Sequence, residues 1–520
     1  MKICILTAGK GARMGEYGKI INKSLLPVKN KAILSHTIES FSIDDTFVIA
    51  LGHNADQVKS YLKIAHPDRK LCFVNVKNFD GSGSGPGLSL LSCKEFLQEP
   101  FYYVPGDCII HTDLKKIKFD NWLGISKIKP SESNAFCNVM LEKNRIVDIH
   151  DKEYCHENFA AFTAPLFVSD YEIFWRYLKN QSLIDNEHQI SNGLWGLVNE
   201  SNIYAVNTSW TDLGNLEKFK KIQSKEYGFD FSKPDEFIYF VNDRVIKFFA
   251  DETIISSRIK KANLKPNIFP KIKQTQKNFY SYSYFHGNTF YDSGNPKSFK
   301  NLLNWLDENV WDKREVELKK FHSLCNEFYF KKTMNRLDSF NASHKGFIFP
   351  NSVNSESVPE LKKLLKSLSW ELICDGIPSF IHGDLNFGNI LYQEKPEKFL
   401  LIDWRHDFAG VIEFGDLYYD LAKLYAGLII NFQHIRNGMF KIFGNKHVTI
   451  EFKTWNKQDE YIKILENYIL SKNYNLPKVI MLSGITFLNM APLHKSPFDQ
   501  MLIAMGSVLI NRGLGDLHRN

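Results

Sequence analysis

A glycine-rich segment near the start of the chain carries residue types that suit phosphate binding. It reads LTAGKGARMG from Leu6 to Gly15 and follows a short apolar run that predicts a β-strand. Gly9 and Gly11 would let backbone N–H groups approach phosphate oxygens, and Arg13 and Lys23 would add positive charge. The spacing matches neither the dinucleotide-binding G-x-G-x-x-G pattern nor the Walker loop. For the glycines alone, a tight turn between a strand and a helix is the alternative.

A longer motif extends this loop. From Leu6 to Val28 the pattern LTAGxGxRM followed by KSLLPV resembles the signature of nucleotidyltransferases that join an NTP to a sugar phosphate or to phosphocholine. The resemblance covers most of residues 1–225. It implies in-line attack of a substrate phosphate on the α-phosphorus of the NTP, with pyrophosphate as the leaving group. Ala8, Gly9 and Gly11 would then cradle the triphosphate.

The same resemblance assigns further residues to this site. It implies that Mg²⁺ lies between two aspartates, which would be Asp107 in VPGD and Asp212 in WTDLG. Gly83 and Ser84, in the run GSGSGPG, are candidates for the nucleobase pocket, with a flexible loop as the alternative. Lys152 is a candidate for binding the substrate phosphate, with a solvated surface lysine as the alternative.

A second motif lies in the C-terminal part of the chain. Residues 382–389 read HGDLNFGN, and LIDW follows at 401–404. This order fits a kinase catalytic loop, in which a base reaches the acceptor hydroxyl while an amide and a second carboxylate hold Mg²⁺ on ATP. With GDLYYDLA at 415–422, it resembles the aminoglycoside phosphotransferase and choline kinase superfamily over about residues 230–520. The resemblance implies that Asp384 is the base and that Asn389 and Asp403 are metal ligands.

Two further cations are candidates for this second site. Lys247 in VIKF lies on a predicted strand, as the phosphate-binding lysine of kinases does, although no G-x-G-x-x-G precedes it and an edge-strand lysine is the alternative. Arg405 follows Asp403-Trp404, where choline kinases commonly carry an acid. A cation there would repel choline and suit a neutral or anionic sugar or polyol. Arg405 could instead pair with Asp407 or Glu413.

The elements that must position these residues fall into two regions. In residues 1–228, strands at 2–7, 46–51, 71–76 and 101–104 alternate with helices, which predicts an α/β, doubly wound, Rossmann-like domain. Strands at 139–141, 145–149 and 159–167 are expected as hairpins at one sheet edge. Residues 229–520 predict a two-lobed α+β kinase-like domain, with a small β-rich lobe at about 229–296 and a helical lobe at about 297–520. A helix is expected at 313–330.

Composition excludes several classes of protein. The 520 residues are 44% hydrophobic and 24% charged, which excludes disordered and fibrous chains and predicts about three compact units. The net charge of +7 comes from dispersed residues, so it suits anionic small ligands and gives little support for nucleic-acid binding. Eight cysteines without a C-x-x-C pair favour a reducing cytoplasm. The longest apolar stretch, about 15 residues at 479–493, is shorter than the ~20 that span a bilayer, so no membrane insertion is expected.

Taken together, the two motifs predict a bifunctional enzyme. A kinase using ATP would make a phosphate ester from a sugar, polyol or amino alcohol, and the nucleotidyltransferase would couple that ester to an NTP, with CTP favoured and Mg²⁺ at both sites. The product would serve surface glycan or lipid precursor synthesis. One alternative is a choline kinase fused to a choline-phosphate cytidylyltransferase, and another is a single active domain with a regulatory pseudoenzyme. The sequence leaves homo-oligomerisation open.

Overall fold

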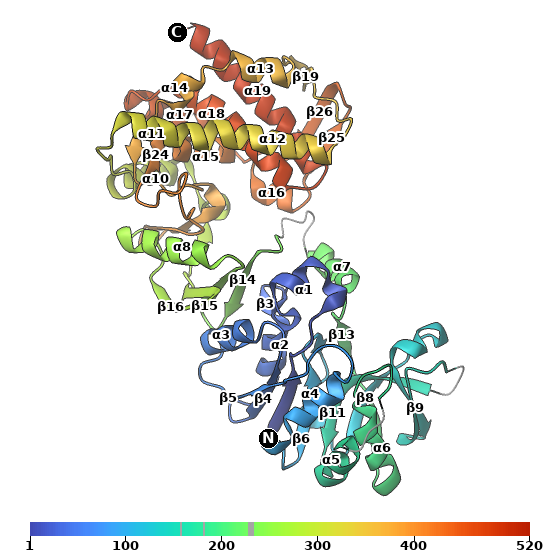
Figure 1. Ribbon diagram of the computed structural model, residues 1–520. Helices are drawn as coiled ribbons and strands as arrows, with labels where there is room; N and C mark the ends of the chain where they lie inside the picture. The colour runs from blue at the N-terminus through green and yellow to red at the C-terminus, as the bar shows by residue number, and fades with distance from the viewer. Residues whose placement is uncertain (156–158, 180–182, 227–232, 520) are drawn as a thin grey trace. The chain divides into compact units, whose positions relative to one another are not determined.

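A computed structural model describes residues 1–155, 159–179, 183–226 and 233–519 (Figure 1). The chain forms two compact units. The first comprises Met1–Gln223, Lys233–Glu252 and Lys273–Tyr282, and the second comprises Ser224–Ser232, Thr253–Ile272 and Ser283–Asn520. The predicted boundary between residues 228 and 229 lies outside the described residues and stays a prediction.

A nine-stranded sheet organises the first unit. In spatial order its strands are β5 (Lys70–Asn75), β4 (Thr46–Leu51), β1 (Lys2–Leu6), β6 (Phe101–Pro105), β11 (Phe159–Val168), β8 (Trp122–Ser126), β12 (Tyr204–Asn207), β10 (Arg145–Asp151) and β9 (Cys137–Glu142). The strands β5, β4, β1 and β6 pair in parallel, and β11 runs antiparallel to β6. The predicted α/β class is confirmed, and the parallel region includes the strand that leads into the glycine loop.

The position of β11 differs from the sequence expectation of an edge hairpin. This strand lies inside the sheet, between β6 and β8, and also pairs with β9. A shift of register between Phe162 and Leu166 divides the strand into two parts. Its N-terminal part reaches β9 while its C-terminal part reaches β6. A bulge of this kind bends a strand, so one strand can serve two sets of neighbours that its apolar pattern does not reveal.

Both faces of the parallel region are buried. Ile3, Ile5 and Ile49 belong to one apolar core, whereas Cys4 and Val48 belong to the other, as the alternation of side chains along a strand requires. The helices of this unit are α1 (Glu16–Ile20), α2 (Ile33–Glu39), α3 (Ala55–Ala65), α4 (Pro86–Ser92), α5 (Tyr171–Lys179), α6 (Ser191–Glu200) and α7 (Leu216–Glu226). Residues of α2 and α3 line the first core, and residues of α4, α5 and α6 line the second.

A second, four-stranded sheet also packs in the first unit. Its order is β14 (Glu236–Val241), β15 (Arg244–Phe249), β17 (Phe279–Ser283) and β16 (Ile272–Gln276). Phe237, Tyr239 and Phe248 share an apolar core with β1 and α2, and the Tyr239 hydroxyl donates to the Leu25 carbonyl at 2.9 Å. The strands predicted as a small kinase-like lobe thus bury their apolar side chains against the α/β region.

Helices dominate the second unit. They are α8 (Glu252–Leu264), α9 (Phe290–Ser293), α10 (Pro296–Asn309), α11 (Leu318–Cys325), α12 (Lys332–Ser343), α13 (Leu361–Ser367), α14 (Trp370–Cys374), α15 (Leu417–Ile429), α16 (Phe432–Arg436), α17 (Gln458–Ser471), α18 (Leu476–Met490) and α19 (Phe498–Arg519). In Figure 1, α11 and α12 form one continuous rod. The rod begins at Leu318 rather than at the predicted residue 313, because Lys313 and Arg314 pair in extended conformation with Ser379 and Pro378.

Short strands complete the second unit. One sheet contains β18 (Asn288–Thr289), β22 (Ile390–Gln393) and β23 (Lys398–Leu401), and another contains β20 (Glu356–Ser357), β19 (Ser352–Val353), β26 (His447–Phe452) and β25 (Phe440–Phe443). The strands β21 (Pro378–Ser379) and β24 (Gly415–Asp416) form a pair. The turn between β22 and β23 brings the two predicted catalytic motifs of this unit to neighbouring strand ends.

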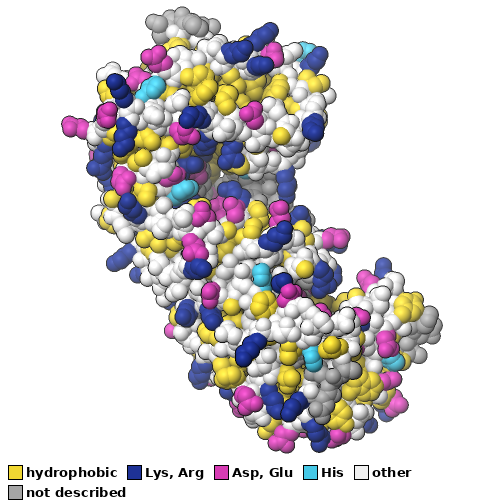
Figure 2. All heavy atoms as spheres, in the orientation of Figure 1, with side chains coloured by type: hydrophobic (Ala, Val, Ile, Leu, Met, Phe, Trp, Pro, Cys, Tyr) yellow, Lys and Arg dark blue, Asp and Glu magenta, His cyan; other side chains and the backbone are white. Residues whose placement is uncertain are grey.

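One segment of the described residues, Leu476–Leu493, is long and apolar enough to cross a membrane by length and composition, with a mean hydropathy of 1.4. The structure buries 67% of it, and Val479, Leu482 and Phe487 belong to the core. This pattern is typical of a core helix. On the visible face in Figure 2, basic and acidic side chains are interspersed rather than gathered into a patch of one sign.

Candidate functional sites

The glycine loop after β1 has an open backbone. A Cβ added at Gly9 would meet no atom within 4 Å, so the space beside this residue is free for a ligand. Gly11 adopts a φ of 64°, in the left-handed region that favours glycine. Ala8 is fixed from behind, because its carbonyl accepts the His53 N–H at 2.9 Å. The loop is therefore held on its protein side and exposed on the side where a triphosphate is predicted.

Asn22 is a positioning residue that the sequence analysis missed. Its side chain is fully buried, and its amide nitrogen donates to the carbonyls of Thr7 at 2.8 Å and His53 at 2.7 Å. Its amide oxygen accepts from the Ser24 N–H at 3.0 Å and the Ser24 hydroxyl at 2.7 Å. Asn22 thus ties the end of β1 and the loop after β4 to the turn that carries Lys23. Only its place beside the KSLLPV motif could have drawn attention to it.

Backbone pairing brings Asp107 and Asp212 together. Asp107 directly precedes β7 (Cys108–Ile110), and Asp212 ends β13 (Trp210–Asp212), which pairs antiparallel with β7 so that Asp212 lies opposite Cys108. The Leu213 N–H donates to the Asp107 carbonyl at 3.0 Å. Two aspartates that are far apart in the sequence therefore become close neighbours through main-chain hydrogen bonds.

Gly214 lies at the centre of this site. A Cβ at this position would be 3.0 Å from Asp212 Oδ1, 3.6 Å from Asp107 Oδ2 and 3.9 Å from an Arg13 guanidinium nitrogen. The missing side chain thus leaves a space lined by two carboxylates and one cation. Carboxylate oxygens are the ligands that Mg²⁺ prefers, so the donor set fits the predicted metal.

Lysines neutralise both carboxylates. Lys23 Nζ lies 2.5 Å from Asp107 Oδ2, and Lys218 forms an ion pair with Asp212. Burial opposes ionisation of Asp107, but Lys23 and Arg13 outweigh it and hold the pKa of this carboxyl below its ordinary value. Asp107 is therefore ionised at neutral pH. Arg13, Lys23, Asp107 and Asp212, predicted from the sequence as one site, lie together in the structure.

The predicted nucleobase and substrate residues also share one region. The Gly83 N–H donates to the Asn186 carbonyl at 2.8 Å, and the Ser84 carbonyl accepts the His188 N–H at 2.7 Å. Lys152 Nζ lies 3.4 Å from carboxylate oxygens of Asp185 and Glu187, in the same segment as Asn186 and His188. One segment thus links the predicted base loop to the predicted substrate lysine.

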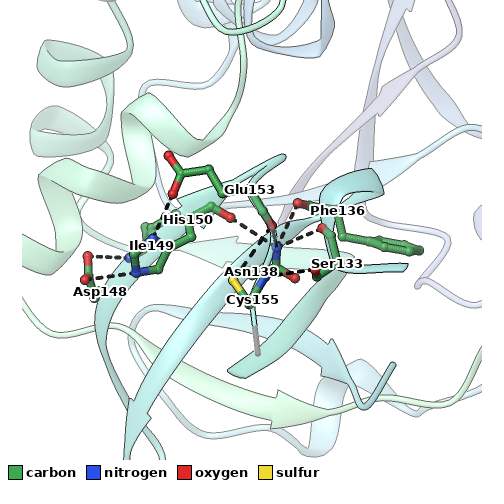
Figure 3. A network of polar contacts seen from close by, with 8 residues as sticks. All are labelled: Ser133, Phe136, Asn138, Asp148, Ile149, His150, Glu153 and Cys155. Carbon is green, nitrogen blue, oxygen red and sulfur yellow. Dashed lines mark hydrogen bonds and ion pairs between the residues drawn. The ribbon is translucent and has the colours of Figure 1, made fainter. Parts of the chain in front are cut away.

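A buried asparagine fixes the loop around Lys152 (Figure 3). The Asn138 amide nitrogen donates to the carbonyls of Ser133 at 2.8 Å, Phe136 at 3.2 Å, Glu153 at 3.2 Å and His150 at 3.3 Å. The Lys152 N–H in turn donates to the Phe136 carbonyl at 2.9 Å. The backbone at Lys152 is therefore anchored, while its side chain pairs with Asp185 and Glu187.

The N-terminal part of the chain resembles sugar-phosphate nucleotidyltransferases. It is 26% identical over 218 residues to the bifunctional protein GlmU of Methanocaldococcus jannaschii, which covers 41% of this chain and 51% of that protein. It is 23% identical over 247 residues to a UTP–glucose-1-phosphate uridylyltransferase of Synechocystis, covering 42% and 61%. The chain thus spans about half the length of the archaeal GlmU relatives it matches.

Solved structures match the same region. A UDP-glucose pyrophosphorylase complexed with UDP-glucose aligns with 43% of this chain and 97% of its own, at a TM-score of 0.38 and 18% identity. The inositol-1-phosphate CTP transferase of T. maritima aligns with 43% of this chain and 95% of its own, at a TM-score of 0.35 and 16% identity. No family model matches the chain.

Beyond the nucleotidyltransferase-like region, the second predicted site is built around the loop His382–Asn389. Asp420 of α15 holds this loop from the buried side. Its carboxylate is fully buried and accepts the N–H groups of His382 and Gly383, both at 2.7 Å, and the Trp311 indole N–H at 3.2 Å. Burial raises the pKa of Asp420 to about 6 against these hydrogen bonds. These three hydrogen bonds, which we call the Asp420 clamp, fix the two residues that precede Asp384.

His382 links the two motifs of this site. Its Nδ1 accepts the Asp384 N–H at 3.2 Å, so Nε2 carries the proton and donates to the Ile402 carbonyl at 2.9 Å. Burial lowers the pKa of His382 to about 4, which keeps the imidazole neutral at pH 7. The Ile402 N–H also donates to the Asn389 carbonyl at 2.9 Å. Asp384, Asn389 and Asp403 are therefore held in one place by a buried histidine and a main-chain bond.

The predicted base has a cationic partner. Lys423 of α15, buried with 8% of its side chain exposed, places Nζ 2.6 Å from Asp384 Oδ1, and the Asn389 amide donates to Asp384 Oδ2 at 3.3 Å. Partial burial opposes ionisation of Asp384, but Lys423 lowers its pKa to about 2. Lys423, which the sequence analysis missed, lies one turn after Asp420 in the GDLYYDLA helix. On the other side, Arg258 lies 3.8 Å from Asp403 Oδ1.

The other two predicted cations, Lys247 and Arg405, lie in different units. Lys247 lies on β15 in the first unit, so its predicted phosphate contact stays a prediction. Arg405 packs against the loop His382–Asn389, because a Cβ at Gly383 would be 2.7 Å from Arg405 Cβ. Its Nε donates to the Asp407 carbonyl at 3.0 Å and lies 4.0 Å from Asp407 Oδ1, which is the pairing considered as the alternative.

Neither site forms a complete cage for a metal. Among the described residues, no three or more His, Cys, Asp or Glu side chains are grouped so that they could hold a metal ion by themselves. Each site instead offers two oxygen ligands, Asp107 with Asp212 and Asn389 with Asp403. This number suits Mg²⁺, which commonly takes one or two protein ligands and completes its shell with phosphate oxygens and water.

Proposed function

We propose that the first unit is a nucleotidyltransferase that couples a phosphate ester to an NTP and releases pyrophosphate. The observation that carries this proposal is the arrangement of Asp107, Asp212 and Arg13 within 4 Å of one point beside Gly214. The resemblance of this region to sugar-phosphate nucleotidyltransferases supports the reaction class.

The residues of this unit would reduce the electrostatic repulsion between the two negatively charged reactants, the NTP and the phosphate ester. Backbone N–H groups of the loop at Ala8, Gly9 and Gly11 bind the triphosphate, while Arg13 and Lys23 neutralise it. Asp107 and Asp212 would hold Mg²⁺, which supplies further positive charge at the α-phosphate. A substrate phosphate oxygen forms the new bond to the α-phosphorus, the α–β bridging bond breaks, and pyrophosphate leaves. Gly83, Ser84 and Lys152 line the region proposed for the base and the substrate.

We propose that the second unit is an ATP-dependent kinase for a small hydroxyl compound. Asp384 accepts the hydroxyl proton, the oxygen forms a bond to the γ-phosphorus, and ADP leaves with the electrons of the broken bond. Asn389 and Asp403 would hold Mg²⁺ against the ATP phosphates. Lys423 keeps Asp384 ionised, and His382 fixes the distance between the two motifs. The support is the clamped geometry of the loop together with its sequence motif.

Together the two units would convert X-OH to X-phosphate and then to NDP-X. Joining them raises the local concentration of the intermediate. We propose CTP as the donor because fused choline kinases and choline-phosphate cytidylyltransferases combine the same two reactions. Surface glycan or lipid precursors are the proposed use of NDP-X, in the cytoplasm.

The direct test is to incubate the full chain with ATP, Mg²⁺ and a panel of sugars, polyols and amino alcohols, each with CTP, UTP, GTP or dTTP. Products are identified by mass. We expect a nucleotide-linked product that carries one added phosphate from ATP, with CTP the preferred donor. If added phosphate esters are coupled but no alcohol is phosphorylated, the second unit is a pseudoenzyme and the kinase half of the proposal is wrong.

A further inference from the structure

Basic side chains gather on the side of the second unit's site that carries Asp384. Arg405 packs against Gly383, the residue directly before Asp384, and Lys423 is ion-paired with Asp384. Lys332 and Arg336 lie one turn apart on α12 and so share a face of the helix. We call these four residues the cation cluster: Lys332, Arg336, Arg405 and Lys423.

An aromatic ring holds two members of the cluster together. Lys332 Nζ lies 4.1 Å from the centroid of the Phe328 ring, and Arg405 Cζ lies 5.0 Å from the same centroid. Phe328 is itself fixed, because it stacks on Phe408 at 4.1 Å and meets the edge of Tyr419 at 4.8 Å. The ring therefore holds two basic side chains on one rigid support, and one of them, Arg405, packs against the loop that carries Asp384.

An irregularity in the rod formed by α11 and α12 creates this arrangement. Residues Asn326–Lys331 form a π-helical turn between the two α-helices. A π-turn inserts an extra residue, so it rotates the residues that follow and commonly occurs at functional sites. Here it contains Phe328 and immediately precedes Lys332.

The positive charge of the cluster is only partly neutralised. Lys423 pairs with Asp384 and Arg405 contacts Asp407, whereas Lys332 and Arg336 form no ion pair with a carboxylate among the described residues. Asp407 also accepts from the Gly410 N–H and contacts His406. Burial together with the charges of Arg405, Arg336 and Lys423 lowers the pKa of Lys332 to about 6, against the opposing effect of the nearby Asp407 carboxylate, and an anion bound beside Lys332 would favour its protonated form.

We propose that the acceptor of the kinase site already carries an anionic group, a carboxylate or a phosphate, and that Lys332, Arg336 and Arg405 bind it. This inference rests on the proposed kinase function and narrows its substrate class. An anion between these cations would gain charge-assisted hydrogen bonds, with Arg336 and Arg405 able to bind it in a bidentate manner. The nearby hydroxyl of the same molecule would then face Asp384. A quaternary ammonium such as choline would be repelled.

The first test compares acceptors of matched size on the full chain, with ATP and Mg²⁺. Glycerol is the neutral probe, glycerate and glycerol phosphate are the anionic probes, and choline and ethanolamine are the cationic probes. We expect the anionic probes to be the better acceptors. Arg336→Met should raise KM for them about tenfold or more and leave kcat and the KM for ATP within about twofold, because it removes binding of a group that does not react.

Lys331 offers a matched control. It is exposed, adjoins Lys332 and pairs with Glu327, so Lys331→Met removes a charge outside the cluster. This control should leave both KM values unchanged. Equal turnover of neutral, cationic and anionic probes would overturn the proposal while leaving the kinase function intact. An increased KM for ATP in Arg336→Met would assign the cations to the nucleotide and would overturn it as well.

A second measurement does not depend on turnover. Lys332 should react readily with acetic anhydride near neutral pH, and peptide mass mapping can follow its acylation beside that of Lys331. We expect inorganic phosphate to slow acylation of Lys332 but not of Lys331, in the presence of Mg²⁺ and a non-hydrolysable ATP analogue. Arg336→Met should remove this protection. If no probe is phosphorylated, the kinase proposal fails; if phosphate does not protect Lys332, the anion site itself is wrong.

Discussion

The two proposed active sites are assembled by different means. In the first unit, the main chain brings Asp107 and Asp212 together through the pairing of β7 with β13 and the hydrogen bond from Leu213 to Asp107. In the second unit, buried side chains position the site, because Asp420 and His382 hydrogen-bond to the backbone of the loop that carries Asp384 and of the strand end beside it. A site held by side chains should be more easily destroyed by one substitution than a site held by strands. The following predictions test this contrast, from the largest expected effect on stability to the smallest.

Asp420→Ala should have the largest effect. It leaves the N–H groups of His382 and Gly383 buried without an acceptor, at about 1–3 kcal/mol each, and it also frees the Trp311 indole. We expect the second unit to lose about 4 kcal/mol of unfolding free energy and all kinase activity. Urea unfolding of the full chain measures the loss, and the exposed Asp459→Ala serves as control. A stable variant that keeps its kinase activity would show that the clamp is unimportant.

His382 should make the second unit sensitive to acid. Its pKa falls from 6.5 unfolded to about 4 folded, so between these values the unfolded chain binds a proton that the folded chain does not. Stability is therefore complete above pH 6.5 and is lost as the pH falls to 4, by about 3 kcal/mol from this group. His382→Gln can still donate to Ile402 but cannot titrate. The stability difference between the two proteins, measured at several pH values, should decrease across this window; a constant difference would contradict the assignment.

Asn22→Ala tests the first unit in the same way. It removes a buried amide that joins the end of β1 to the turn at Lys23. We expect a loss of about 2 kcal/mol, since the carbonyls of Thr7 and His53 lose their donor. Nucleotidyltransferase activity should decrease more than this stability loss explains, because Lys23 is no longer fixed beside Asp107. Activity measured well below the unfolding temperature, with the kinase reaction of the same sample as control, separates the two effects.

Gly214→Ala should have the smallest effect on stability. The added methyl group would lie 3.0 Å from Asp212 Oδ1 and 3.6 Å from Asp107 Oδ2, in the space proposed for Mg²⁺. We expect unfolding free energy to change by less than about 1 kcal/mol while nucleotidyltransferase activity falls at least about tenfold and requires more Mg²⁺. Unchanged Mg²⁺ dependence would place the metal elsewhere.

The sequence predicted the secondary-structure elements that follow from local residue patterns and the site residues that belong to recognisable motifs. The succession of short apolar runs and helical segments predicted the strands of the parallel region, and the glycine loop with its longer motif led to Arg13 and Lys23. The same reasoning placed β11 at an edge, because a strand with apolar residues on both faces has the same pattern whether it is paired on one side or on both. It also began the rod at residue 313, where contacts with β21 keep the chain extended.

The residues that the sequence did not reveal share one property. Asn22, Lys423 and Asp420 act through partners that only the tertiary fold brings to them, such as the carbonyl of His53 or the N–H of Gly383. A polar residue within an apolar stretch marks each of them, but the pattern does not say which loop it binds. The cation cluster is similar, because Lys332 and Arg405 are far apart in the sequence and both contact the ring of Phe328 only in the folded chain.

The central claim is that one chain carries two separate active sites. Its most direct test uses Asp107→Asn and Asp384→Asn in parallel, with phosphorylation of an acceptor and coupling of added phosphate ester to CTP both assayed. We predict that Asp384→Asn abolishes phosphorylation and leaves coupling intact, and that Asp107→Asn does the reverse. Loss of both activities in either variant, or retention of both, would contradict the assignment of these two aspartates to independent sites.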